Sequence, residues 1–151
     1  MLTTCFDEAL REVVEEVLES MCFLFLDDPA AAEPAAGTPA LTRQLSFTGP
    51  FQGSFGIETS LGTAALLACN VLGQEPEELS PELVGESLGE IANMVCGAVL
   101  CRIENTHTFQ LSSPSANLES VAANATVERT TNTFCVEGGT LHVWIEIHNI
   151  P

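Results

Sequence analysis

Near the N-terminus, apolar residues recur every three or four positions, which is the spacing of one face of an α-helix. Seven of them lie between residues 4 and 22, with acidic residues between them: Phe6, Leu10, Val13, Val14, Val17, Leu18 and Met21. The pattern predicts an amphipathic helix. Residues 27–40 contain three prolines and one glycine. We expect this stretch to be a flexible surface loop, because proline interrupts regular structure.

Residues 41–60 alternate in part between apolar and polar side chains, as β-strands do. Gly49-Pro50 and Gly53 interrupt the alternation, so this stretch predicts two strands joined as a hairpin. Ser60 is placed to cap a short apolar helix that ends at Leu72. The glycine that follows this helix suits the left-handed backbone conformation in which helices often end.

A longer helix is predicted from Pro81 to about Arg102. Ser80 supplies a hydroxyl cap, Pro81 has no amide hydrogen to leave unpaired, and Glu82 favours the positive end of the helix dipole. Three strand-like segments come after it: residues 108–112, 126–136 and 141–147. This order of elements predicts an α+β fold, in which helices pack on a mostly antiparallel sheet and the long helix is central.

Composition narrows the class of protein. The 151 residues include 21 acidic side chains against four arginines and no lysine, and the net charge is −17. Nucleic-acid binding needs clustered cations, so we expect no nucleic-acid partner. The length predicts a single domain over residues 1–151. No apolar run approaches about 18 residues, and the acidic N-terminus is unlike a signal peptide. We therefore expect a cytoplasmic protein with no membrane contact.

The six cysteines form no C-x-x-C pair, and most of them have apolar neighbours. That environment is typical of buried thiols and not of a disulfide framework or a structural zinc site.

The helix predicted at 81–102 carries two different faces. On a projection of about 100° per residue, six apolar residues share one arc and are expected to face the core: Val84, Leu88, Ile91, Ala92, Val95 and Val99. Four other residues lie on the opposite side, within an arc of roughly 60°; we call Glu86, Glu90, Asn93 and Gly97 the outward stripe. Glycine there leaves room for another surface. A solvated helix face with a packing glycine explains the same pattern.

The segment that holds the outward stripe, ELVGESLGEIANMVCGAV, resembles the signature helix of the CheX and CheC group of chemotaxis phosphatases. In that group an Asp or Ser is followed four residues later by Glu and three further on by Asn. Glu86, Glu90 and Asn93 stand at these places, and Gly97 has a family-like spacing. Glu86 is a departure, because the group more often has Asp or Ser there.

Three further features extend the resemblance over most of the chain. The N-terminal EVLESMCF is similar to the opening helix of CheX-like domains, the hairpin glycines at 49–53 stand in the expected place, and Pro114 follows the long helix as the family's proline does. The spacing from Asn93 to this proline is slightly shorter than the family's. Glu16 and Glu19 lie on the first helix without an asparagine, so the chain resembles the single-site CheX members more than two-site CheC.

The resemblance implies a function. A CheX-like protein hydrolyses the aspartyl phosphate of a CheY-like receiver domain, with Asn93 orienting the attacking water and Glu90 pairing with a receiver lysine. Glu86 and Gly97 would contact the partner. The receiver is expected to supply Mg²⁺, so we expect the chain to carry no cofactor or metal of its own. The family also implies a homodimer, which would cover a sheet edge.

One alternative is a CheX-like module that docks a receiver or another signalling protein without accelerating hydrolysis, with Glu86 as the disabling change. Another is a metal site, because His142, Glu146 and His148 share one face of the last predicted strand with Trp144. An exposed mixed strand face explains that pattern more simply. The hairpin phenylalanines at 47, 51 and 55 are expected in the core or an interface and not in a ligand pocket.

Overall fold

The computed structural model describes residues 2–26, 40–116, 126–137 and 139–149. Within these residues the elements follow in the order α1 (Leu2–Met21), β1 (Ala40–Thr48), β2 (Gln52–Ser60), α2 (Leu61–Leu72), a 3₁₀ turn η2 (Pro76–Glu78), α3 (Pro81–Ile103), β3 (Gln110–Leu111), β4 (Thr126–Val136) and β5 (Gly139–Asn149).

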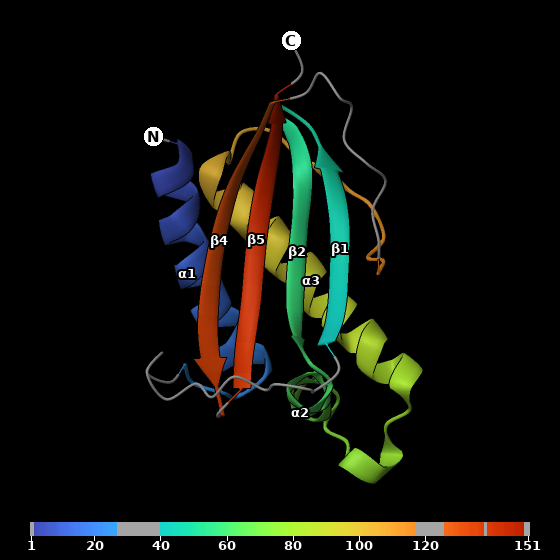
Figure 1. Ribbon diagram of the computed structural model, residues 1–151. Coiled ribbons are helices and arrows are strands. Elements are labelled where there is room, and N and C mark those ends of the chain that lie inside the picture. The colour runs from blue at the N-terminus through green and yellow to red at the C-terminus, as the bar shows by residue number, and fades with distance from the viewer. Residues whose placement is uncertain (1, 27–39, 117–125, 138, 150–151) are drawn as a thin grey trace.

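The strands form one antiparallel sheet in the order β3-β1-β2-β5-β4. Helices α1 and α3 lie side by side against one face of this sheet, and α2 lies beneath one end of it (Figure 1). The predicted α+β class, with α3 as the long central helix, is confirmed.

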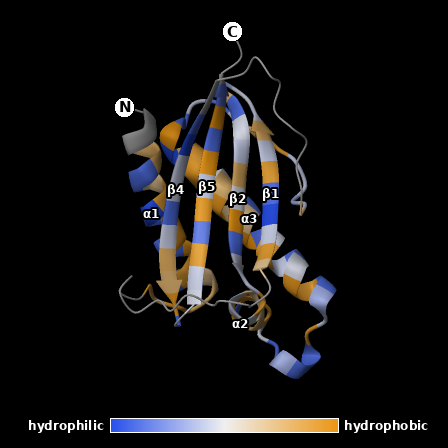
Figure 2. Ribbon diagram, in the orientation of Figure 1, coloured by the Kyte–Doolittle hydropathy of each residue, from blue (hydrophilic) through white to orange (hydrophobic). Residues whose placement is uncertain are grey.

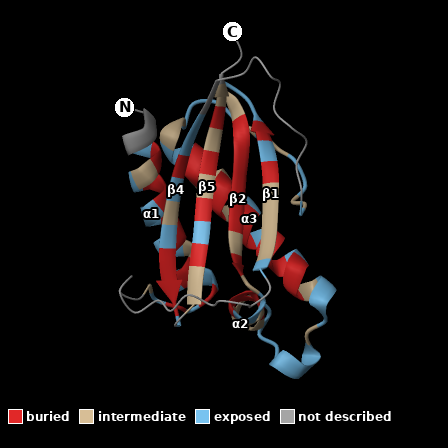
Figure 3. Cartoon of the chain, viewed as in Figure 1, coloured by how far each residue is buried: buried red, intermediate tan, exposed pale blue. Residues whose placement is uncertain are grey.

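The register of the strands decides which side chains face the helices. Leu45 of β1 pairs with Phe55 of β2, which pairs with Ile145 of β5, and all three are buried. Along β5, apolar and polar residues alternate, and the buried positions are the apolar ones (Figures 2 and 3). In β2 burial is nearly continuous and includes Ser54 as well as Phe55 and Ile57. The face of the sheet away from α1 and α3 therefore carries the polar side chains of these strands.

The caps predicted for two helices are confirmed. The Ser60 hydroxyl accepts a hydrogen bond from the amide of Thr63 (3.1 Å), and α2 ends at Gly73, whose φ of 66° is left-handed. The Ser80 hydroxyl accepts from the amide of Leu83 (3.1 Å) at the start of α3. Local hydrogen-bonding chemistry thus sets these helix ends.

Helix α3 presents its predicted apolar arc to the core, and all six residues of that arc are buried. Among the described helices, α3 is the one whose length and apolar composition would suffice to cross a membrane. Most of the apolar window that meets this criterion is buried inside the domain. Packing against α1, α2 and the sheet accounts for its hydropathy.

The predicted break at Gly53 is wrong, because this residue lies inside β2. A Cβ atom there would collide with the backbone carbonyl oxygen of Glu146 and with the ring of Phe47. The glycine therefore allows close packing and does not interrupt the strand. The loop predicted at 27–40 lies outside the described residues, apart from Ala40, which begins β1.

Two of the hairpin phenylalanines, Phe47 and Phe55, are buried, and Phe51 is half-buried against the edges of Phe6 and Phe109. Their predicted place in the core is confirmed.

The six cysteines are free thiols. Burial raises the pKa of Cys22 to about 11 and that of Cys96 to about 12, which keeps both thiols protonated and unreactive near neutral pH. Cys5 and Cys101 are exposed.

Candidate functional site

The outward stripe lies where the projection placed it. Glu86, Glu90 and Asn93 are exposed, and Gly97 is half-buried. Residues three or four apart on a helix are neighbours on its surface, so the four positions form one continuous row along α3. Within the described residues, none of the three side chains makes a hydrogen bond or an ion pair. Their polar groups are therefore free to meet another molecule.

The rest of the molecule holds α3 in place. At its C-terminal end, Arg102 donates to the carboxylates of Glu12 and Glu16 on α1, each at 2.6 Å. At its N-terminal end stands the Ser80 cap. Because its apolar arc is buried between these points, the outward stripe stands on a fixed helical backbone.

A groove of about 540 Å³ runs beside Glu86 and Glu90. Its other wall is the chain segment after β3, which pairs with β1 through Ser115: the Ser115 amide donates to the Gln44 carbonyl at 2.8 Å and the reverse bond is 2.7 Å. This pairing places Pro114 against α3, where an added Cβ on Gly89 would lie 3.0 Å from the Pro114 Cβ. The proline that carries part of the family resemblance thus forms a wall of this groove.

The floor of the groove contains a residue that the sequence analysis did not select. Arg43 extends from the helix-facing side of β1, and its guanidinium covers the backbone of Gly85 on α3. Its Nη1 donates to the Thr42 carbonyl at 2.7 Å. The available signal was its parity. Arg43 lies on the same face of β1 as Leu45 and Phe47, both of which face the core, so an arginine in that series has to emerge beside a helix.

A second hollow, of about 270 Å³, adjoins the outward stripe at Gly97 and is walled by Leu100, Phe109 and Leu111. An added Cβ on Gly97 would meet one atom of Leu111, at 4.0 Å. That is ordinary van der Waals contact, so the packing of the described chain does not require glycine there.

At the rim of this hollow stands Glu104. Hydrogen bonds from the hydroxyl and amide of Thr106, and then from His107, lower the pKa of the Glu104 carboxyl to about 2. It therefore remains a carboxylate at any physiological pH.

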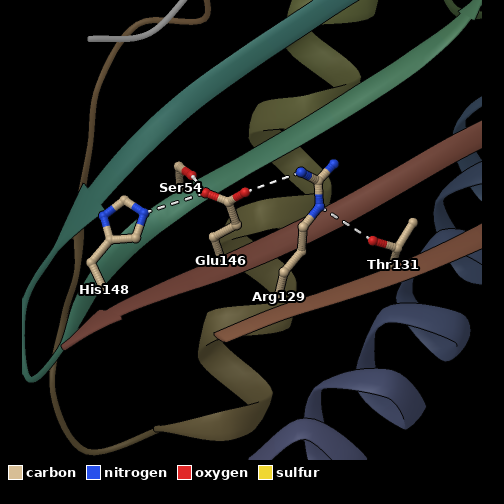
Figure 4. A network of polar contacts seen from close by, with 5 residues as sticks. All are labelled: Ser54, Arg129, Thr131, Glu146 and His148. Atoms are coloured by element: carbon tan, nitrogen blue, oxygen red, sulfur yellow. Dashed lines mark hydrogen bonds and ion pairs between the residues drawn. The ribbon is translucent and has the colours of Figure 1, made fainter. Parts of the chain in front are cut away.

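The polar face of the sheet holds the residues considered for a metal site. The Glu146 carboxylate accepts hydrogen bonds from Ser54 (3.3 Å) and Arg129 (3.2 Å). The oxygen that contacts Ser54 also lies 3.5 Å from His148 Nε2 (Figure 4). His142 instead contacts the Thr133 hydroxyl at 3.0 Å. In the part of the chain that the structure describes, no group of three or more His, Cys, Asp or Glu is arranged to hold a metal ion.

Of the two glutamates weighed for a second site on α1, one has a partner inside the molecule, and Glu19 is exposed. Glu16 pairs with Arg102 across α1 and α3. The Asn70 side-chain amide, on α2, donates to the Cys22 carbonyl at 2.7 Å. The arrangement on α3 is therefore not repeated on α1 or α2.

A family model described as chemotaxis phosphatase CheX matches residues 42–137, more than half of the chain, including the whole outward stripe and Pro114. Among curated protein sequences no relative matches.

Solved structures share the fold. The chemotaxis protein CheX from Vibrio vulnificus is 23% identical, with a TM-score of 0.68 over 93% of this chain and 94% of that one. CheX in a CheX–CheY–BeF3–Mg²⁺ complex from Borrelia burgdorferi is 19% identical, with a TM-score of 0.68 over 93% and 96%. A CheC-like superfamily protein from Shewanella sp. PV-4 is 20% identical, with a TM-score of 0.67 over 95% and 97%.

Proposed function

Since this chain belongs to the CheX family, we propose that it hydrolyses the aspartyl phosphate of a CheY-like response regulator. The outward stripe carries the proposal. Glu90 and Asn93 stand one turn apart on the exposed side of a helix whose other side is buried, and no neighbour in the described chain engages their polar groups. The CheX of Borrelia burgdorferi, which has this fold, was crystallised with CheY, and this supports a receiver as the partner.

The chemistry suits a carboxamide beside a carboxylate. The water oxygen bonds to phosphorus while the bond from phosphorus to the aspartyl oxygen breaks, which leaves a carboxylate and inorganic phosphate, and the water protons pass to phosphate and solvent. Because an acyl phosphate is already activated, the main task is to hold the water in line. In this proposal the Asn93 amide holds the water, since it both donates and accepts hydrogen bonds.

The other members of the outward stripe hold the partner. Glu90 pairs with a lysine of the receiver and so fixes the register of the two proteins. Glu86 contacts the receiver one turn earlier, and Gly97 leaves space for its backbone or side chains one turn later. The Mg²⁺ that assists phosphoryl transfer comes with the receiver in this scheme.

The test is the decay of a phosphorylated CheY-like receiver, measured with wild type, Asn93→Ala and Glu90→Ala. Wild type is expected to accelerate the decay. Asn93→Ala should lose about 100-fold of that acceleration, the scale seen when one positioning group of an active site is removed, while still binding the receiver. Glu90→Ala should lose both affinity and rate, because the register is no longer fixed.

Glu19→Ala is the matched control, because Glu19 is an exposed glutamate on α1 and does not belong to the outward stripe. It should behave as wild type. A receiver that binds wild type tightly but decays no faster, in a panel of receivers, would contradict the phosphatase and support the non-catalytic docking module. In that case Glu86→Asp becomes the informative variant.

A further inference from the structure

Arg43 differs from the other arginines of this acidic chain. Arg11, Arg102 and Arg129 each have a carboxylate oxygen within 4.0 Å. In the described residues Arg43 has none, although Glu82, Glu86 and Glu90 line the same groove. Its guanidinium makes one hydrogen bond, to the Thr42 carbonyl, and a guanidinium has five N–H donors. Donors of Arg43 therefore remain available in the groove.

The packing around Arg43 holds the guanidinium in the groove. The residue is half-buried, and the guanidinium carbon lies 3.2 Å from the position that a Cβ of Gly85 would take, with Nη2 closer still. A side chain at position 85 would thus push the guanidinium away. A partly desolvated cation without a carboxylate partner is unfavourable, so binding of an anion there is favoured.

We propose that Arg43 binds an acidic side chain on the surface of the receiver domain when the receiver docks on the outward stripe. This inference rests on the proposed function and extends it: the groove is a docking site with both charges, in which Glu86 and Glu90 take cations and Arg43 takes a carboxylate. A planar guanidinium suits a carboxylate because it can donate two parallel hydrogen bonds.

The location of Arg43 gives it a role in docking the receiver and not in the chemical step. It lies on Gly85, eight residues before Asn93, which is roughly 12 Å along the helix axis at about 1.5 Å per residue. A phosphoryl group held at Asn93 is out of its reach. Arg43 therefore contributes to the affinity for the receiver with or without phosphate, and it leaves the chemical step unchanged.

The first experiment measures the dissociation constant for a receiver that the wild type binds, both unmodified and with BeF3 and Mg²⁺. Arg43→Gln should raise the dissociation constant about tenfold for both forms, as expected for a charge-assisted hydrogen bond worth about 1.4 kcal/mol. In the decay assay KM should rise and kcat should stay. Arg129→Gln is the matched control, because Arg129 lies on the opposite face of the sheet, and it should bind as wild type.

The second experiment displaces the guanidinium without removing its charge. Gly85→Ala should weaken receiver binding in the wild-type background and have no further effect in the Arg43→Gln background. Gly62→Ala controls for the added methyl group, since nothing lies within 4 Å of that position on α2. Thermal melting of each variant shows that it is folded.

Three results would overturn the inference while leaving the phosphatase intact. In the first, Arg43→Gln binds the receiver as tightly as wild type does. In the second, Arg43→Gln weakens binding of the BeF3 form only, which would make the phosphoryl group the anion. In the third, Gly85→Ala weakens binding equally in both backgrounds, which would show that the methyl group itself meets the receiver. A wild type that binds no receiver overturns the proposed function together with this inference.

Discussion

Gly53 shows how one missing side chain decides the packing of two strands. Its Cα faces the carbonyl of Glu146 on β5 with no space for a methyl group. We expect Gly53→Ala to lower the free energy of unfolding by about 3 kcal/mol, because backbone must move to admit the added carbon. Urea denaturation measures this.

Gly62→Ala is the counterpart with the opposite sign. The position is exposed on α2 and has open space around it, so alanine should stabilise by up to about 1 kcal/mol through helix propensity. If both variants shifted the urea midpoint alike, collision with β5 would not be the reason for the glycine at 53.

The residues that the sequence could identify are those whose role depends on near neighbours in the chain. Ser60, Gly73 and Ser80 act on amides or carbonyls within a few residues, and all three were predicted. Gly53 and Arg43 act on segments that are distant in sequence. No local pattern reveals the contact of Gly53, and the strand parity of Arg43 indicates its face of the sheet but not the glycine that it covers. Phe23 was missed for another reason: where α1 ends it takes a φ of 56°, a conformation that usually calls for glycine.

At the scale of elements, α3 is the part on which the proposed activity depends, and its first turn is held by Ser80. We expect Ser80→Ala to cost about 1 kcal/mol of stability, because the amide of Leu83 loses its acceptor. Chemical denaturation is the measurement.

Ser20→Ala is the matched control. The Ser20 hydroxyl donates to the carbonyl of Glu16 inside α1, where alanine is the better helix former. The substitution should leave stability unchanged or slightly higher. Equal losses for the two serines would mean that the cap at Ser80 is not what stabilises the start of α3.

The outward stripe could be predicted from helical periodicity because all four of its residues lie on one helix. The groove beside it could not, since it is formed by α3, β1 and the segment of Pro114 together. The pairing of Ser115 with Gln44 joins positions more than 70 residues apart. Sequence therefore indicated the exposed row of side chains but not the shape of the surface around it.

At the scale of the whole molecule, β4 ends the sheet on one side with eleven residues. Strand edges of this length are usually covered or paired. We expect the protein to be a homodimer, with a species of about 32 kDa, twice the 16.0 kDa chain, in sedimentation velocity at micromolar concentration.

The charge of −17 per chain adds a condition to that expectation. Two such chains repel each other, and salt screens the repulsion. The dimer should therefore tighten between about 50 mM and 300 mM salt, where the screening length falls below about 10 Å. Monomers alone at every salt concentration would contradict the dimer.

The polar face of the sheet has one further consequence. Trp144 lies there against Gly56 and beneath the guanidinium of Arg129, whose carbon is 4.8 Å from the ring centroid. It is the sole tryptophan, and the chain has no tyrosine. Ultraviolet fluorescence of the native protein thus comes from one indole, on the face opposite α3. The chain carries an intrinsic optical label that reports the sheet and is insensitive, by its position, to what binds the outward stripe.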